Sequence, residues 1–359
     1  MKIVSIFFLS ITFSLLVMAA VFGQNQHEKL QEIQKQIDAI AAVNMLDEKG
    51  SIAASAWPIA KTPSYFFSMD VIYWKAFIGG SEFVTTNNTL NTQLPIVGSI
   101  KSDSLDWNWG LKAAIGKVFD YDQWGVVGEW TYFNTNGSSK VHGGVENALI
   151  PLRGSYAQSI QRAYSWMKMD FMNLDINLCR YYFTSSTLAF KPRVGIKNTW
   201  NKLQQQVFYS QGASLLGNLA YTLDKSKMWG IGPNAGIDTT WYLGKNFSIL
   251  GLFSVSTLYS YFRVNEKSIV TTHPELSLQL TEKHHRFIPN LQWRLGLGWN
   301  RYFSNRQRRV DLSLAYESLY YFRLNQMFTL SEFQNTFRAQ GLSEDISMYG
   351  VTFNFQYSF

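Results

Sequence analysis

The last segment of the chain, Ser347–Phe359, constrains the fold more than any other stretch because its side chains alternate in polarity. Every second residue is aromatic or aliphatic, and the residues between them are glycine or polar. The apolar positions are Tyr349, Val351, Phe353, Phe355, Tyr357 and Phe359. A period of two residues predicts a β-strand with one apolar and one polar face. In a membrane-spanning β-barrel the apolar face meets lipid and the polar face meets the lumen.

The composition of the chain agrees with a barrel and disfavours a bundle of membrane helices. Charged residues make up 16% of the sequence, against about 25% in soluble domains. Aromatic residues are frequent, also at 16%, yet the mean hydropathy is close to zero. Beyond the N-terminus, no segment reaches the roughly 20 uninterrupted apolar residues of a membrane helix. We therefore expect the chain to cross a membrane with strands.

The N-terminus has the pattern of a secretory signal peptide. Lys2 precedes the apolar run Ile3–Val21, and small or permitted residues allow cleavage near Gly23/Gln24. We expect residues 1–23 to be removed and the mature protein to be exported. The alternative is an uncleaved N-terminal anchor.

A short amphipathic helix and a linker are predicted for residues 24–62, in the periplasm. Apolar residues recur three or four positions apart, at Leu30, Ile33, Ile37 and Ile40. About two heptads are short for a stable coiled coil. The segment therefore permits a homo-oligomer without requiring one, and a solvated helix is the alternative. The barrel domain is expected at residues 63–359.

Ten segments from Ser64 onward have the length and polarity of strands. They are Ser64–Phe77, Leu105–Phe119, Trp124–Asn134, Ser165–Phe183, Thr187–Asn201, Lys227–Leu243, Phe247–Arg263, Phe287–Phe303, Arg309–Arg323 and Ile346–Phe359. In the eighth of them, Leu291, Trp293 and Leu295 alternate with Gln292 and Arg294. Such alternation predicts strands with one lipid-facing side.

The connections between these segments alternate in length. Short ones fall at 120–123, 184–186, 244–246 and 304–308, and long ones at about 78–104, 135–164, 202–226, 264–286 and 324–345. Bacterial barrels have short periplasmic turns and long external loops. The sequence therefore predicts an all-β fold, a transmembrane antiparallel barrel of about ten to twelve strands. The upper number allows for further strands in the long connections, for example at Gln205–Ser210.

The chain ends on the apolar face of its last strand, and this ending looks like the signal read by the bacterial barrel-assembly machinery. We assign Phe355, Tyr357 and Phe359 to that signal. The assembly machinery and outer-membrane lipid are then expected partners.

Several strand motifs occur in a characteristic order. They are Leu105–Leu111, Asp122–Trp124, Trp166–Asp170, Leu174–Ile176, Pro192–Lys197, Trp229–Asp238 and Gly350–Phe353. Together they resemble the Legionella-type major outer membrane proteins, pore-forming barrels also represented among chlamydia-like bacteria. The resemblance spans about 65–359, and the Gly-Pro segment at 229–238 is its most specific part. It implies an outer-membrane barrel with porin activity, and it brings no catalytic residue.

Function in such a barrel is expected on the lumen-facing parity of the strands. The ionisable residues assigned there are Asp70, Lys112, Glu129, Lys168, Asp170, Asp175, Lys191, Arg193, Lys197, Asp238, Arg294, Asp311 and Glu317. They give one basic wall on Thr187–Asn201 and an acidic wall on Arg309–Arg323. Opposed charged walls order water and favour small polar solutes. The alternative role is structural, because barrels of about eight strands leave room only for side chains.

Two motifs that suggest other chemistry are set aside. Gly230–Gly236 has the wrong spacing for a dinucleotide fingerprint, and no helical pattern follows it. Pro233 within it lacks a backbone N–H, so we expect a β-bulge there. His284 and His285 point in opposite directions in an extended chain and make a poor metal clip. Cys179 is the only cysteine, which excludes an internal disulfide, and its parity predicts an unpaired thiol in the lumen.

The formal net charge of +7 does not predict a nucleic-acid partner, because the basic residues are not clustered as they are in nucleic-acid-binding proteins. We find no nucleophile and base at a spacing that suggests an enzyme, and we expect no metal and no cofactor. The sequence thus predicts an outer-membrane porin for passive diffusion of small hydrophilic solutes. The alternative is a non-conducting structural or adhesive barrel that acts through its long external loops.

Overall fold

The computed structural model describes residues 65–87, 96–119, 124–144, 148–154, 160–185, 187–210, 219–244, 246–271, 277–303, 308–333 and 336–359. All of them belong to one compact unit, Ala54–Phe359. The predicted signal peptide (1–23) and most of the predicted helix and linker (24–62) fall outside this unit, and both fall outside the described residues.

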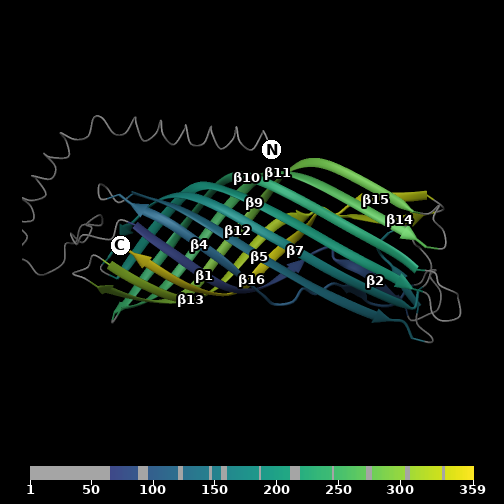
Figure 1. Ribbon diagram of the computed structural model, residues 1–359, viewed down its shortest axis with the longest axis horizontal. Helices are drawn as coiled ribbons and strands as arrows, with labels where there is room; N and C mark the ends of the chain where they lie inside the picture. The colour runs from purple at the N-terminus through teal and green to yellow at the C-terminus, as the bar shows by residue number, and fades with distance from the viewer. Residues whose placement is uncertain are drawn as a thin grey trace, which may run out of the picture. The chain divides into compact units, whose positions relative to one another are not determined.

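Ten antiparallel strands close into a barrel, which confirms the predicted fold class (Figure 1). In their order around the barrel they are β1 (Tyr65–Ile78), β4 (Asn108–Val118), β5 (Trp124–His142), β7 (Arg162–Arg180), β9 (Leu188–Ser210), β10 (Leu219–Gly244), β11 (Phe247–Val270), β12 (Leu278–Phe303), β13 (Arg308–Asn325) and β16 (Glu344–Ser358). Pairing of β16 with β1 completes the ring, and Tyr65 and Phe359 exchange backbone hydrogen bonds of 3.0 and 2.8 Å at this seam.

The register fixes how steeply the strands tilt. A path that starts at Arg286 on β12 steps from each residue to its register partner on the next strand. The path passes Thr199, Lys112 and Asp70 and returns to β12 at Gly298, 12 residues further along the strand. A stagger of this size requires strands inclined by roughly 35–45° to the barrel axis. Figure 1 shows the resulting tilt.

The shorter strands lie in the connections. A three-stranded sheet contains β2 (Glu82–Asn87), β3 (Ile100–Ser102) and β6 (Ala148–Pro151), and a hairpin contains β14 (Phe328–Phe333) and β15 (Thr336–Gly341). A further two-residue strand, β8 (Tyr182–Phe183), pairs with β9. Figure 1 places β2, β14 and β15 at the end of the barrel opposite the C-terminus. We call this the loop end, and the end with the short connections the turn end.

Several strands extend further toward the loop end than the sequence predicted. β5 ends at His142 rather than Asn134, and β9 ends at Ser210, so the extra strand expected at Gln205–Ser210 is the continuation of β9. β10 and β12 begin eight or nine residues earlier than expected, and β11 ends seven residues later. In these extensions polar residues occupy both faces, for example Gln204 and Gln205 on β9. Alternation of polarity therefore no longer marks the strand there.

The outer face of the barrel is apolar along its turn-end half. On β1, for example, Phe67, Met69, Val71 and Tyr73 are exposed, whereas Asp70 and Ile72 between them face inward and are buried. The same alternation continues on β16, where Val351, Phe353 and Phe355 are exposed. Phe359, which also belongs to the predicted assembly signal, is exposed as well. Exposed rings and aliphatic side chains over a wide band are typical of a surface that faces lipid.

The expected bulge at Pro233 is wrong. The register of β10 with β9 continues through Pro233, which lies opposite Ile196, and the register with β11 is the same before and after it. Around the proline, the pairing with β11 is interrupted at Gly232 and Pro233 without a change of register. A Cβ atom on Gly232 would lie 1.9 Å from the Thr257 carbonyl oxygen. Glycine thus lets the two strands stay close without an extra residue. The one register shift in this pairing lies between Tyr242 and Gly244.

Among the described residues, no helix is long and apolar enough to cross a membrane.

Candidate functional site in the barrel lumen

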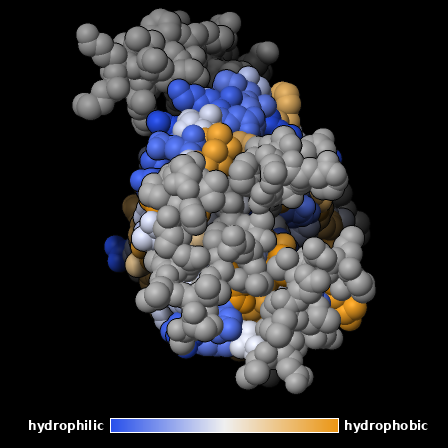
Figure 2. Space-filling model, turned by 90° about the vertical axis from the view of Figure 1, so that its right-hand side faces the viewer, coloured by the Kyte–Doolittle hydropathy of each residue, from blue (hydrophilic) through white to orange (hydrophobic). Residues whose placement is uncertain are grey.

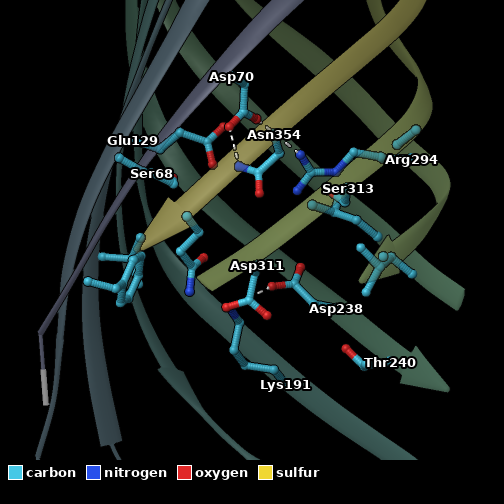
Figure 3. Close-up of a pocket in the computed structure, with 18 of the residues that line it drawn as sticks. Ser68, Asp70, Glu129, Lys191, Asp238, Thr240, Arg294, Asp311, Ser313 and Asn354 are labelled. Atoms are coloured by element: carbon cyan, nitrogen blue, oxygen red, sulfur yellow. Dashed lines mark hydrogen bonds and ion pairs between the residues drawn. The ribbon is translucent and has the colours of Figure 1, made fainter. Parts of the chain in front are cut away.

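All but two of the predicted lumen residues point into the barrel. The structure places Asp70, Lys112, Glu129, Asp175, Lys191, Arg193, Lys197, Asp238, Arg294, Asp311 and Glu317 on the inward parity of their strands. They lie in the turn-end half, and Figure 3 shows several of them converging from β1, β9, β10, β12 and β13.

Lys168 and Asp170 are the exceptions and require a correction. Both lie on the outer face of β7, where Lys168 Nζ is 3.5 Å from Asp170 Oδ1. Asn134 on β5 also donates to Asp170. Their inward neighbours are Met167, Met169 and Phe171, which are buried. Near the loop end the outer face no longer needs to be apolar, so a charged residue there does not indicate the lumen.

Lys112 and Glu317 form the central ion pair of the lumen. Lys112 Nζ lies 2.5 Å from Glu317 Oε1 and 3.9 Å from Glu129 Oε1. Gln292 donates to Glu317 Oε1 at 2.7 Å, and Thr352 donates to Glu317 Oε2 at 3.1 Å. The Glu317 side chain is 0% exposed. Its charge is therefore held by one cation and two neutral donors, as a buried carboxylate requires.

A second group of ion pairs adjoins the first, because Asp70 and Arg294 are the register partners of Lys112 and Glu317. Arg294 Nη1 on β12 is 3.4 Å from Asp70 Oδ2 on β1, and Asn354 also donates to Asp70 (Figure 3). Asp238 on β10 accepts from two residues of β9, with Lys191 Nζ at 3.1 Å and Arg193 Nε at 3.7 Å.

The two predicted walls of charge do not stand unpaired, because each wall has counter-charges from other residues around it. Lys197, the third member of the basic wall, lies 3.4 Å from Asp175 on the adjacent β7. On the acidic wall, Asp311 accepts from Arg309 Nε at 2.8 Å. Each basic residue thus has an acidic partner within 4 Å, which matches the structural alternative of ion pairs that fill a narrow barrel.

A cavity of about 210 Å³ remains between these side chains. Its lining includes Asp70, Glu129, Lys191, Asp238, Arg294 and Asp311 (Figure 3). Cys179 also lines it, and its thiol donates to the Gly125 carbonyl oxygen at 3.4 Å. This agrees with the lumen position predicted for the free thiol.

An apolar core fills the lumen on the loop-end side of the charged residues. On β1, Ile72, Trp74, Ala76 and Ile78 follow Asp70 toward the loop end and are at most 3% exposed. Every other barrel strand except β4 contributes to this core, with Phe133, Met167, Met169, Phe171, Leu203, Met228, Leu258, Phe262, Val264, Ile288, Leu319, Tyr321, Ile346 and Met348.

Phe171 and Tyr321 show how completely this core crosses the barrel. They lie on β7 and β13, which are diametrically opposite in the ring of ten strands. Their ring centroids are nevertheless only 5.7 Å apart. On one side of the core, Trp74 packs against Phe133 with centroids 5.7 Å apart, and its indole N–H donates to Thr352 at 3.2 Å. Side chains from opposite walls thus meet at the centre of the lumen.

Arg153 joins the connections at the loop end. It is only 1% exposed, and its guanidinium donates to three backbone carbonyls, those of Gly80, Glu82 and Phe328. Its Nη1 also lies 3.7 Å from Asp224 Oδ2 on β10. Tyr209 Oη accepts from the Arg153 backbone N–H at 3.2 Å. One buried side chain therefore ties the β1–β2 link, the start of β14 and the barrel wall together.

Two buried carboxylates face each other beside Arg153. Asp224 on β10 and Glu266 on β11 are directly paired in the register, and each is 1% exposed. Burial raises the pKa of both groups, and repulsion from Asp224 raises the pKa of Glu266 further. The positive charge of Arg153 lowers the pKa of Asp224 and so offsets part of the effect of burial. Sequence analysis missed Arg153, Asp224 and Glu266 because all three fall in segments predicted to be loops.

The histidine pair behaves as its extended backbone predicts. The His284 ring stacks on the buried Phe262 with centroids 5.2 Å apart, whereas the His285 ring stacks on the exposed Tyr259 at 5.4 Å. They face opposite sides of the wall. Within the described ranges, no group of three or more His, Cys, Asp or Glu residues is placed to hold a metal ion.

An antiparallel barrel with an apolar outer face and polar, charged residues inside defines the class of outer-membrane β-barrel proteins. A family model described as the Legionella pneumophila major outer membrane protein precursor matches residues 58–359. The chain therefore belongs to this family, as the strand motifs predicted, and its location is the bacterial outer membrane. The loop end is then the external end.

Solved structures resemble the chain only in fold. The outer membrane protease OmpT from Escherichia coli has 11% identity and a TM-score of 0.43, covering 86% of this chain and 100% of that one. The toluene transporter TodX from P. putida has 11% identity and a TM-score of 0.28, covering 86% and 95%. The autotransporter NalP translocator domain from Neisseria meningitidis has 7% identity and a TM-score of 0.30, covering 95% and 99%. No curated protein matches the chain.

Proposed function

We propose that this protein is a non-conducting outer-membrane barrel that acts through its external end, as a structural or adhesive surface protein. The observation that carries the proposal is the contact of Phe171 with Tyr321 across the lumen, within a core of buried apolar side chains. A solute would have to displace that core, and close-packed side chains do not yield without a large free-energy cost.

The size of the external part supports the same proposal. β9, β10, β11 and β12 extend well beyond the apolar outer band, and Arg153 holds the connections against them. Figure 2 views this end, where described hydrophilic residues gather toward the top of the view and hydrophobic residues are also visible. Strand extensions and ordered connections of this kind provide a rigid surface on which external contacts are made.

Passive diffusion of small hydrophilic solutes is the second candidate function. The charged cavity of about 210 Å³ in the turn-end half favours it, because charged lumen walls are what a pore for polar solutes uses. Under this reading the apolar core is one state of a gate. Small polar solutes would then join outer-membrane lipid and the barrel-assembly machinery as partners. Neither candidate involves catalysis or a cofactor.

Conductance of the refolded full-length protein in planar lipid bilayers separates the two candidates. Heat-modifiable migration in gels first shows that the barrel is folded. The proposal expects no stepwise current at any holding potential. A liposome-swelling assay with small neutral sugars extends the test to uncharged solutes, and no swelling is expected. Reproducible single-channel steps, or swelling that depends on sugar size, would overturn the proposal in favour of a porin.

A variant of the apolar core serves as the matched control. Phe171→Ala with Tyr321→Ala removes the contact between opposite walls and leaves the charged residues unchanged. If the core is what blocks the lumen, this variant conducts in short, irregular openings while the unaltered protein stays silent. The variant Tyr316→Ala removes an exposed ring of the outer face on the same strand as Tyr321 and should stay silent as well.

A further inference from the structure

A row of basic residues crosses the outer face of the barrel at the external edge of its apolar band. Lys202 on β9 is paired with Lys227 on β10, Lys227 with Arg263 on β11, and Arg263 with Lys283 on β12. All four side chains are exposed and share the outward parity of their strands. We call Lys202, Lys227, Arg263 and Lys283 the basic row. Side chains paired in this way have Cβ atoms about 4.5–5.5 Å apart.

An aromatic row lies directly beneath the basic row. Two residues further toward the turn end on each strand are Trp200, Trp229, Tyr261 and His285, which are paired with one another in the same order. The exposed apolar side chains of Val194, Ile196, Val255 and Leu295 lie beyond them. Aromatic rings collect where the hydrocarbon of a bilayer meets its head groups. The basic row therefore runs through the head-group region of the outer leaflet, inclined to the membrane plane as the tilt of its strands requires.

Within the part of the chain that the structure describes, Asp170 at one end of the basic row is the single carboxylate paired in register with it. None of its four members takes part in an ion pair there, and Asp170, paired in register with Lys202, is itself 3.5 Å from Lys168. Lys225, one pair further out on β10, adds to the positive charge. Like charges directly opposite each other on neighbouring strands are destabilising. An anionic ligand that spans the row would remove this repulsion.

The row is confined to one side of the barrel. On the other side, the outer face near the loop end of β1, β4 and β16 carries aromatic residues in mutual contact. Tyr73 and Trp107 have ring centroids 5.4 Å apart, and Trp107 and Tyr349 are 6.0 Å apart. Lys75 on β1 is the basic side chain nearest to them along that strand. A general attraction to head groups would not require such a one-sided arrangement, whereas a discrete site does.

We propose that the basic row binds the phosphate groups of an outer-leaflet glycolipid that carries phosphate on its sugar head group. Three lysines supply point charges, and Arg263 supplies a planar guanidinium that binds a phosphate with two parallel hydrogen bonds. The acyl chains of the same lipid would lie along the aromatic row and the apolar band beneath it. A lipid fits better than a soluble anion because the charged and apolar parts of the surface are continuous. The inference depends on the outer-membrane location and not on whether the lumen conducts.

The test compares a row variant with a matched control of equal charge. The row variant carries Lys202→Gln, Lys227→Gln, Arg263→Gln and Lys283→Gln. The control carries Lys75→Gln, Lys101→Gln, Lys140→Gln and Arg308→Gln, which remove three lysines and one arginine elsewhere. Binding of a diphosphorylated glycolipid and of its dephosphorylated form is measured for each folded barrel in neutral detergent micelles, by native mass spectrometry and by tryptophan fluorescence.

The row variant is expected to bind the phosphorylated lipid at least about tenfold more weakly than the control, because each basic side chain near a lipid surface contributes to the attraction. The dephosphorylated lipid should bind both variants equally. For the unaltered protein, raising the salt concentration should weaken binding of the phosphorylated lipid alone, because exposed charges are screened. This last measurement does not depend on the folding of any variant.

Equal binding of the phosphorylated lipid by the row variant and the control would overturn the proposal. Salt-independent binding by the unaltered protein would do the same. So would a row variant whose oligomeric state changes while its lipid binding does not, because the row would then be a contact between protomers. Inorganic phosphate at millimolar concentration should compete only weakly, and full displacement by it would assign the site to a soluble anion instead.

Discussion

Glu317 illustrates how single residues hold the lumen of this barrel together. Its carboxylate is fully enclosed and accepts from Lys112, Gln292 and Thr352. A buried ion pair adds little net stability compared with apolar side chains, but loss of one partner leaves the other charge buried and unpaired. The contributions of Lys112 and Glu317 to stability are therefore coupled, and comparison of the two single variants with the double variant measures this coupling.

The variant Glu317→Gln is expected to lower the free energy of unfolding by about 3–5 kcal/mol, because Lys112 then keeps only the more distant Glu129 as a counter-charge. Lys112→Met should cost a similar amount, since it leaves the Glu317 carboxylate unpaired. The double variant Lys112→Met/Glu317→Gln removes both members of this ion pair. The glutamine oxygen at the Oε1 position still accepts from Gln292, and the amide N–H at the other position donates to the Thr352 hydroxyl, which rotates to accept it. It should be more stable than either single variant.

Urea unfolding of the refolded barrel in detergent, followed by tryptophan fluorescence, measures the three free energies. The control is Lys117→Met. Lys117 lies near the turn end of the same strand, and its ammonium group lies over the Tyr65 ring rather than in a buried ion pair. Strictly additive losses in the double variant would mean that Lys112 and Glu317 do not form the pair described here.

At the scale of elements, the connections at the external end depend on Arg153. Its guanidinium donates to carbonyls of three residues, Gly80, Glu82 and Phe328, which belong to two different connections. The variant Arg153→Met leaves these carbonyls without a donor and Asp224 without its cation. Amide hydrogen exchange in Ser81–Val84 is therefore expected to accelerate by about tenfold or more, since each 1.4 kcal/mol of lost stability gives a factor of ten.

Exchange in the barrel strands near the turn end should not change in Arg153→Met. Arg162→Met, an exposed arginine at the start of β7, is the matched control and should leave the exchange of both regions unaltered. Accelerated exchange across the whole barrel would show instead that Arg153 stabilises the global fold.

The buried pair Asp224 and Glu266 gives the external part a pH dependence with a definite sign. A carboxyl group whose pKa is raised in the folded state stabilises the fold fully below its ordinary pKa, which is 4.5 for Glu266. That stability is lost as the pH rises from there through the raised value. Raising the pH from 5 to 9 should therefore lower the melting temperature, and Glu266→Gln should reduce the decrease.

Circular dichroism melts of the two proteins at both pH values measure the effect. Glu282→Gln on the neighbouring strand is the control, because that carboxylate is half-exposed and lies beside His284. It should melt with the same pH dependence as the unaltered protein. A Glu266→Gln variant with an unchanged pH dependence would mean that the Glu266 carboxyl group does not titrate differently in the folded state.

The strands themselves show where sequence analysis succeeds and why it stops. Inside the bilayer the outer face must be apolar, so Val351, Phe353 and Phe355 identify both the strand and its orientation. Beyond the bilayer this requirement ends. The alternation then fails to reveal the extension of β9 to Ser210, and it misplaces Lys168 and Asp170 on β7. The partners of Lys197 and Glu317 were not predictable either, because they depend on the stagger of strands that are distant in the sequence.

At the scale of the whole molecule, the number of strands decides what the interior contains. A barrel of ten strands is only slightly wider than those whose lumen is filled by side chains, and much narrower than the sixteen-stranded porins that hold water. Here the remaining space is divided along the axis into a charged, partly hollow region and an apolar core. The sequence shows the charges but not the packed core. Alternation puts Trp74 on the same face as Asp70, but only the register of all ten strands shows that Phe171 and Tyr321 meet across the lumen.

The last residue of the chain lies at the end of the seam where β16 pairs with β1 and closes the barrel. Phe359 pairs with Tyr65 through two backbone hydrogen bonds, its ring is exposed on the outer face, and it stacks near both Tyr65 and Tyr357. We predict that Phe359→Ser impairs assembly in the outer membrane, because the variant loses the terminal ring at the seam where β1 meets β16. The measurement is the amount of heat-modifiable barrel in the membrane fraction, which should fall several-fold.

Phe303→Ser is the matched control, since Phe303 is an exposed ring at the same end of the barrel on β12, away from the closing seam. It should assemble at close to the normal level. Refolding of purified Phe359→Ser in detergent separates two reasons for a defect. If the purified variant refolds as well as the unaltered protein, the ring acts in recognition by the assembly machinery; if refolding is also slow, it acts by stabilising the seam. Normal levels of folded Phe359→Ser barrel in the membrane would contradict both roles.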